Sequence, residues 1–288
     1  RPPRSTLFPT RRSSDLTAAV MGCIALLAGC GKGSDSSSKA EEGAKTSDDG
    51  SINKDLTATE LARLLGNGTN LGNTMEAYGH KSYSADTAPE SFETFWGQPV
   101  TTEEMIKGMK ASGFDSLRVP VAWTNAMEYE KGDYTINEAY LDRVEEIINY
   151  ALDNDMYVII NDHWDGSWWG MFGSSEQSDV DKAFEMYKSM WTQIANRYKK
   201  YSDRLIFEGA NEELGDRLND TDVCKNSGSL SKAECYEMAN KINQTFVDTV
   251  RATGGNNEQR FLLIAGYNTD ITMTCSNKFQ MPTDTAKD

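Results

Sequence analysis

The chain has 288 residues, of which 38% are hydrophobic, and its 44 acidic against 29 basic residues give a formal net charge of −15. Such a composition suffices for one large hydrophobic core. The excess of negative charge opposes binding to nucleic acid or anionic lipid, so we expect neither as a partner. We expect a neutral substrate instead.

We expect a targeting signal over residues 17–30. Residues 17–30 form an apolar segment that is too short to span a bilayer and that ends in the sequence LAGC. This ending resembles the lipobox of a bacterial lipoprotein signal. The resemblance implies a lipid on Cys30 and a protein anchored outside the cytoplasm, at the cell surface or envelope, whose only membrane contact is that anchor. A buried hydrophobic segment is the alternative. Residues 1–16 begin with Arg and resemble a translated sequencing-adapter junction, so we expect a non-native leader.

The next segment, residues 31–55, is rich in Ser, Gly, Lys, Glu and Asp and has no aromatic residue. Because it cannot bury a core, we expect a flexible polar linker there and the folded domain over residues 56–288. Cys224 and Cys235 flank a polar loop, which a disulfide could close in an oxidising compartment. No pair of cysteines has metal-site spacing, and we expect no metal and no cofactor.

From Thr57 onward, strands alternate with helices. Thr57 and Glu60 form the pattern of a capping box that opens a short helix. Hydrophobic residues recur at helical spacing within 140–152 and 184–198, and we assign both stripes to the core. The first of five predicted strands begins near residue 66, and the other four cover 114–121, 156–160, 204–209 and 260–266. The third is almost continuously apolar, as expected for a parallel strand buried on both faces.

Loop lengths predict how these units are arranged. The links that follow strands are long, whereas the links that precede them are short, so elaboration gathers at the carboxyl ends of the strands. That asymmetry is typical of a (β/α)₈ TIM barrel, whose active site lies at this end. An open doubly wound sheet is the alternative, but the first turn, residues 68–73, lacks the GxGxxG phosphate loop. We therefore expect an α/β chain, a TIM barrel truncated after about strand 5.

Polar residues at the predicted strand ends are where chemistry is expected. Glycoside hydrolysis with retention needs a carboxylic acid that protonates the leaving oxygen and a second carboxylate about 5–5.5 Å away. Glu212, at the end of the fourth strand, is the first candidate for the acid. The strand ends also present Asn70, Asn73, Glu76, Arg118, Trp123, His163, Trp164, Asp165, Trp168, Trp169, Asn211 and Glu213.

Three ordered motifs carry a resemblance. RVPVAW at 118–123, NDHWDG at 161–166 and FEGANE at 207–212 resemble the strand 2, 3 and 4 signatures of glycoside hydrolase family 5, of the endo-β-glucanase type. The resemblance implies that Glu212 is the general acid/base and that Asn211 binds the sugar 2-hydroxyl at the cleavage point. Arg118 would lie below the catalytic carboxylates and keep the nucleophile ionised.

The resemblance extends less securely to the third strand. His163 would line the subsite before the cleaved bond, and Trp164 stands where the family often has a second histidine. Trp168 and Trp169 would form a sugar platform, with Trp96 a weaker candidate. Each residue also has a structural alternative: Arg118 as a partner of buried carboxylates, His163 as a core histidine, Glu208 as a structural residue pointing away from its neighbours, and Glu213 as a cap.

The function expected is that of a retaining, endo-acting β-glycoside hydrolase, working as a monomer on plant cell-wall β-1,4-glucan, mixed-linkage glucan or xyloglucan. The family's strand 6 His-x-Tyr element, strand 7 nucleophilic glutamate and strand 8 tryptophan find no match, so we expect this fragment to be inactive. A non-catalytic carbohydrate-binding surface lipoprotein is one alternative. A metal-dependent barrel using His163, Asp165 and Glu212 is disfavoured, because the first two are only two positions apart on a loop.

Overall fold

A computed structural model of the chain describes residues 48–163, 165, 168–220, 226 and 228–286. Within them, five parallel strands form one sheet in the order β1-β2-β3-β4-β5. The order never reverses, so this sheet has no switch point of the doubly wound type. The strands are β1 (Gly68–Asn70), β2 (Ser116–Val119), β3 (Tyr157–Asn161), β4 (Leu205–Glu208) and β5 (Leu262–Leu263).

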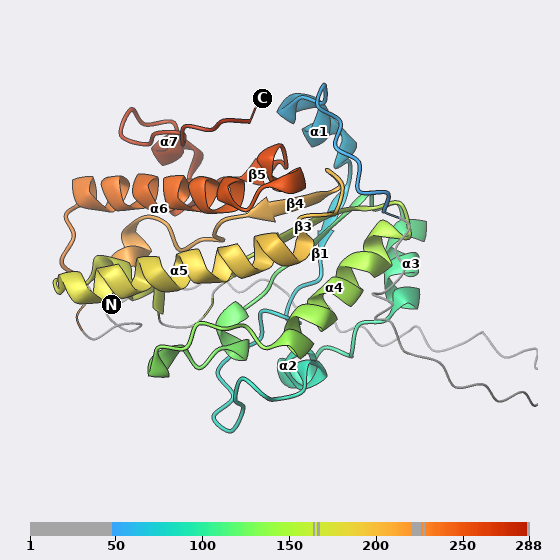
Figure 1. The fold of residues 1–288 in the computed structure, drawn as a ribbon, viewed down its shortest axis with the longest axis horizontal. Helices are drawn as coiled ribbons and strands as arrows, with labels where there is room; N and C mark the ends of the chain where they lie inside the picture. Colours follow the sequence, from blue (N-terminus) through green and yellow to red (C-terminus); the bar gives the residue numbers. More distant parts are fainter. Residues whose placement is uncertain (1–47, 164, 166–167, 221–225, 227, 287–288) are drawn as a thin grey trace, which may run out of the picture. The chain divides into compact units, whose positions relative to one another are not determined.

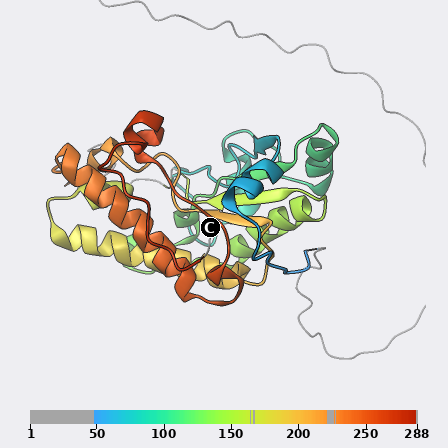
Figure 2. The same cartoon turned by 90° about the horizontal axis from the view of Figure 1, so that it is seen from above.

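Helices cover the strands, and the long ones, α5 and α6, lie side by side in both views (Figure 1, Figure 2). The α-helices are α1 (Ala58–Leu64), α2 (Pro89–Phe95), α3 (Glu103–Ala111), α4 (Glu138–Leu152), α5 (Gln177–Tyr198), α6 (Lys232–Ala252) and α7 (Ile271–Thr274). Six 3-10 helices join them: η1 (Trp123–Ala126), η2 (Tyr129–Lys131), η3 (Trp168–Gly173), η4 (Asp216–Asn219), η5 (Gly255–Glu258) and η6 (Tyr267–Thr269). Strand–helix alternation in sequence order confirms the predicted α/β barrel architecture.

The predicted apolar stripes are buried as expected. On α4, Val144 and Ile147 are fully buried, and on α5 the ring of Trp191 packs against Phe207 of β4 and Phe246 of α6. The capping box at the start of α1 is also present: the backbone N–H of Glu60 donates to the Thr57 hydroxyl, and its carboxylate accepts from the Thr57 N–H.

β2 and β5 are much shorter than the apolar runs predicted for them. β2 ends at Val119 because the next residue is Pro120, which has no N–H to donate to a ladder. β5 is reduced to two residues, since it bonds to β4 alone and has no second strand to fix its backbone. Among the described residues, no helix is both long and apolar enough to cross a membrane.

The linker prediction is wrong at its carboxyl end. The Asp48 carboxylate is buried and accepts hydrogen bonds from the backbone N–H of Ser202 at 2.8 Å and its hydroxyl at 2.6 Å. The side chain of Asn256 donates to the carbonyl of Gly50 at 2.7 Å. Composition predicts little apolar burial here, but polar side chains instead fix the segment by hydrogen bonding. The leader, the lipobox with Cys30 and residues 31–47 of the linker lie outside the described residues.

Candidate active site

Arg118 joins the carboxyl ends of three strands. Its Nε and Nη2 donate to the two carboxylate oxygens of Glu208, each at 2.6 Å, and Nη2 also donates to the Asn211 side-chain oxygen at 2.9 Å. A longer bond of 3.3 Å runs from Nη1 to Asn70. Burial alone would lower the pKa of the Arg118 guanidinium, but the bonds and charge of Glu208 raise that pKa above its ordinary value. The cation is therefore permanent and fixed between β1 and β4.

Glu208 points opposite to its neighbour Phe207, as strand alternation predicts. Phe207 packs on Trp191 of α5, whereas the Glu208 side chain is only 9% exposed and forms a bidentate ion pair with Arg118. Two parallel N–H···O bonds fix both the distance and the plane of the pair. Glu208 therefore lies on the same interior face as Arg118 and Asn211.

Asn211 and Glu212, which end the strand 4 motif, and Glu213, which follows it, differ in burial and in contacts. Glu213 is buried and its carboxylate accepts from the backbone N–H of Asn211 at 2.7 Å, which holds the turn in place. Asn211 is half-buried and its oxygen is engaged by Arg118. Glu212, between them, is exposed to solvent. Hydrogen bonds therefore fix Asn211 and Glu213, and the turn leaves the Glu212 carboxyl accessible to solvent.

His163 lies half-buried just after β3. Its backbone N–H donates to the Val121 carbonyl at 2.9 Å, and its Nδ1 lies 3.1 Å from the side-chain nitrogen of Asn161. Burial, together with the charge of Arg118, lowers the pKa of His163 to about 4, so the ring is neutral at neutral pH. Because the Asn161 amide donates to Nδ1, the ring proton is on Nε2.

The sugar platform expected from Trp168 and Trp169 is not formed. The two side chains are 1% and 4% exposed, stack on each other with ring centroids 4.4 Å apart, and pack against Phe172 and Tyr187. The helix η3 turns both rings onto α5, so they belong to the core. Trp164 lies outside the described residues. Among the described tryptophans only Trp96 is exposed, at 40%.

Buried carboxyl groups flank His163 on both sides. Asp165 accepts from the backbone N–H of Thr124 at 2.9 Å and from its hydroxyl, which ties the loop after β3 to the loop after β2. Neither carboxyl oxygen of Asp162 has a hydrogen-bond partner among the described residues. Burial raises the pKa of Asp162 well above its usual range, and the nearby Asp165 raises it further, which favours the neutral form of this carboxyl. The sequence placed Asp165 at the end of the third strand but did not indicate that Asp162 and Asp165 are both buried.

Other predicted polar residues serve local structure. The buried Glu76 carboxylate accepts from the backbone N–H groups of Asn73 and Thr74, and so caps the turn after β1. Because Asp165 turns toward Thr124, the residues of the metal alternative do not form a ligand set, and the described residues include no group of three His, Cys, Asp or Glu side chains placed for a metal ion. Cys235 is a buried free thiol, while Cys224 lies outside the described residues.

Comparison with known proteins gives one consistent family. The profile of the Cellulase family, glycosyl hydrolase family 5, matches residues 80–288. A xyloglucan-specific endo-beta-1,4-glucanase of Bacteroides ovatus is 39% identical over 231 residues, covering 80% of this chain and 43% of that protein. Endoglucanase A of Paenibacillus barcinonensis is 38% identical over 238 residues, covering 80% of this chain and 54% of that protein.

The solved structures agree. A broad-specificity endoglucanase from Ruminococcus champanellensis with bound cellotriose superposes with a TM-score of 0.68 at 39% identity, covering 80% of this chain and 63% of that chain. An enzyme of family 5 from Prevotella bryantii in complex with a xyloglucan tetradecasaccharide superposes with a TM-score of 0.64 at 36% identity, covering 77% and 61%. The chain spans about half the length of the curated relatives it matches. Profile, sequences and fold together show that the chain belongs to glycosyl hydrolase family 5.

Proposed function

We propose that the protein is a retaining, endo-acting hydrolase of β-1,4-linked glucans, with Glu212 as its general acid/base. The observation that carries the proposal is the turn after β4, where Asn211 is anchored on Arg118 beside an exposed Glu212. The names of the relatives, endoglucanases and a xyloglucan-specific endoglucanase, support the substrate class. The substrate is a neutral plant cell-wall polysaccharide, cellulose-like glucan, mixed-linkage glucan or xyloglucan.

The geometry supports a role for each residue. The oxygen of Asn211 is occupied by Arg118, so its amide N–H groups are directed to other acceptors, and a sugar 2-hydroxyl is such an acceptor. Neutral His163 offers an Nε2–H donor to a second hydroxyl of the same sugar. Glu212 donates a proton to the leaving oxygen in the first step and accepts one from water in the second.

The nucleophile is a separate matter. The neighbouring carboxylates are already engaged, Glu208 by Arg118 and Glu213 by the Asn211 N–H. We therefore propose that the nucleophile is a further carboxylate, on strand 7 as in the family, and that the 288-residue chain alone has no hydrolytic activity. Hydrolysis of soluble β-glucan by this chain, free of contaminating enzyme, would contradict that proposal.

The location of the protein and its oligomeric state are proposed from the sequence. Cys30 carries a lipid that anchors the protein outside the cytoplasm, and the protein acts as a monomer without metal or cofactor. Labelling with a radioactive fatty acid in a bacterial host tests the anchor, since Cys30→Ala should abolish the label.

The central test uses a version of the protein that carries all eight strands of the barrel. Glu212→Gln keeps the shape but removes the transferable proton, so hydrolysis of β-glucan should fall by about 10²–10⁴-fold. An aryl glycoside with an acidic phenol needs no protonation to leave, so its first step should survive. Its intermediate should accumulate, and azide, which needs no general base, should restore turnover.

The matched control is Glu237→Gln, an exposed glutamate on α6, which should leave both activities unchanged. If Glu212→Gln slowed both substrates alike and azide rescued neither, Glu212 would not be the acid/base. A barrel with all eight strands that bound glucan but hydrolysed none would favour the non-catalytic carbohydrate-binding alternative.

A further inference from the structure

A pocket lies at the rim of the barrel, between the loops that follow β1 and β2. It has a volume of about 720 Å³, and two loop segments, 78–85 and 124–131, supply its walls together with Phe92 of α2. None of the residues assigned above to the reaction lines it. The volume is within the range of about 300–1,000 Å³ that is usual for small-molecule sites. The pocket is therefore a second site, separate from the turn that carries Glu212.

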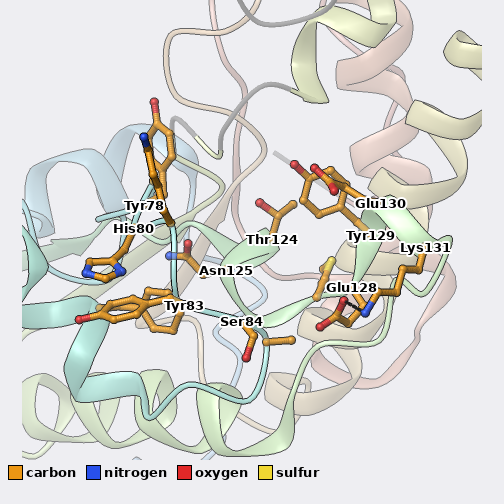
Figure 3. A pocket seen from close by; sticks show the side chains of 15 residues that line it. Tyr78, His80, Tyr83, Ser84, Thr124, Asn125, Glu128, Tyr129, Glu130 and Lys131 are labelled. Carbon is orange, nitrogen blue, oxygen red and sulfur yellow. Dashed lines mark ion pairs between the residues drawn. The ribbon is translucent and has the colours of Figure 1, made fainter.

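One wall of the pocket is aromatic. The ring of Tyr83 stacks on His80 with centroids 3.7 Å apart, and its other contacts are edge contacts with Phe92 at 5.2 Å and a tilted contact with Phe95 at 5.9 Å. Tyr78 stands on the same side (Figure 3). Rings held by neighbouring rings lose little further entropy when a ligand packs on them, and the C–H face of a pyranose is an apolar surface that suits such a wall.

The opposite wall is polar. Glu128 and Lys131 form an ion pair of 2.6 Å across from the aromatic side, and Tyr129 and Glu130 adjoin them (Figure 3). Two acidic and two basic side chains line the pocket, counting Lys81 with Lys131 and Glu128 with Glu130, so the lining has no net charge. Paired charges offer both donors and acceptors to hydroxyl groups, whereas they do not favour an ionic ligand over a neutral one.

The pocket is fixed relative to the strand ends. The Asn125 side chain, which lines it, donates to the Ala77 carbonyl at 2.9 Å and so joins its two loops. Thr124, also in the lining, is held by Asp165, two residues after His163. Both tethers lie on the side of the sheet where β1, β2 and β3 end, which is also the side of the turn after β4 that carries Glu212. The two sites therefore lie at the same end of the sheet.

From these features we infer that the rim pocket binds a neutral sugar unit of the polysaccharide, away from the two units that flank the cleaved bond. The inference rests on the proposed function. It makes the pocket a secondary binding site that increases affinity for long or branched glycans and leaves the chemistry at Glu212 unchanged.

The test fills the pocket without removing any of its walls. Ser84 is exposed and lines the pocket, so Ser84→Trp in the eight-stranded version should block it. We expect KM for long β-glucan to rise about tenfold, the value of one lost ring contact, while kcat/KM for a short aryl cellobioside stays the same. Ser112→Trp is the matched control, since Ser112 is exposed at the end of α3, before β2.

A second measurement is independent of catalysis. In the Glu212→Gln background, migration through gels that contain β-glucan or xyloglucan reports binding directly, and Ser84→Trp should weaken the retardation by about the same tenfold in affinity. Weaker retardation in xyloglucan gels alone would assign the pocket to a xylosyl branch, and weaker retardation in both gels to a backbone glucosyl unit. Unchanged retardation, or an equal loss of activity on polysaccharide and aryl cellobioside, would overturn the inference. If the eight-stranded protein binds glycan but cleaves none, and Ser84→Trp weakens that binding, only the proposed function would be refuted.

Discussion

At the scale of single residues, the site is organised by buried charges that a linear motif does not show. Arg118 is fixed by Glu208 on β4, and Asn211 takes its orientation from the same guanidinium. The buried Asp162 and Asp165 lie on either side of His163. The pKa values of Arg118, His163 and Asp162 are shifted by burial and by neighbouring charges, so they are properties of the folded chain.

Asp162 should make stability depend on pH. A carboxyl whose pKa is raised in the folded state stabilises that state below the pKa of the unfolded chain, and the contribution is lost as pH rises through the folded pKa. Asp165, Glu213 and Tyr187 face it. Asp162→Asn mimics the neutral form, so urea unfolding should show a gain in stability over the parent that is larger at pH 8 than at pH 5.

The control for this experiment is Asp55→Asn, an exposed aspartate before α1, which should leave the pH dependence of the parent intact. Unfolding curves for Asp162→Asn that stay parallel to the parent between the two pH values would mean that the Asp162 carboxyl does not titrate differently on folding.

At the scale of elements, Arg260 connects the end of α5 to the start of β4. It is fully buried, and its guanidinium donates to the carbonyls of Tyr201 at 2.8 Å and Leu205 at 2.6 Å, among others. Burial lowers its pKa to about 10, so it stays charged at neutral pH. A cation at this place donates to carbonyls that the helix end leaves unpaired. It also interacts favourably with the negative end of the helix dipole.

Arg260→Met should therefore destabilise the fold strongly, by about 3–5 kcal/mol, because several buried carbonyls lose their donor together. Arg260→Lys retains the charge but not the fork of donors, and we expect an intermediate loss. Thermal or urea unfolding measures both. Arg63→Met, at an exposed position on α1, is the control and should change stability by less than about 0.5 kcal/mol. Equal stabilities of Arg260→Met and the parent would contradict this role.

At the scale of the whole molecule, the segment before α1 closes the amino end of the sheet. Asp48 bonds to Ser202 and Asn256 reaches back to Gly50, so contacts span most of the described chain. The sheet itself ends in β5, where Leu263 is 44% exposed. The stability of the barrel therefore depends on contacts at its ends as well as on its core.

Removing the anchor of this segment should loosen it. Asp48→Ala deletes the two hydrogen bonds from Ser202 and one from the Gly50 N–H to a charged acceptor, and we expect a loss of about 1–3 kcal/mol and faster proteolysis before α1. Asp49→Ala is the matched control, because the neighbouring Asp49 is exposed and its partner among the described residues is Ser51, two positions away. Similar proteolysis of the two variants would show that Asp48 does not hold the segment.

Much of the architecture could be predicted from the sequence because it depends on local patterns. The helical stripes of α4 and α5, the buried run of β3 and the capping box at Thr57 each follow from the spacing of residue types along a few turns. The ordered motifs likewise located the strand ends and indicated the family. These patterns can be interpreted without knowing which distant segments pack together.

Other features were decided only by tertiary structure. Trp168 and Trp169 have the composition of a sugar platform, but η3 turns both rings into the core. Glu208 points opposite to its neighbours as expected, but only the packed sheet shows that its partner is Arg118 of β2. Asp48 sits in a stretch with the composition of a linker and is nevertheless buried. In each case the outcome depends on a partner 90 or more residues away, or on the packing of a neighbouring helix, and the residue's own surroundings in the sequence carry no record of it.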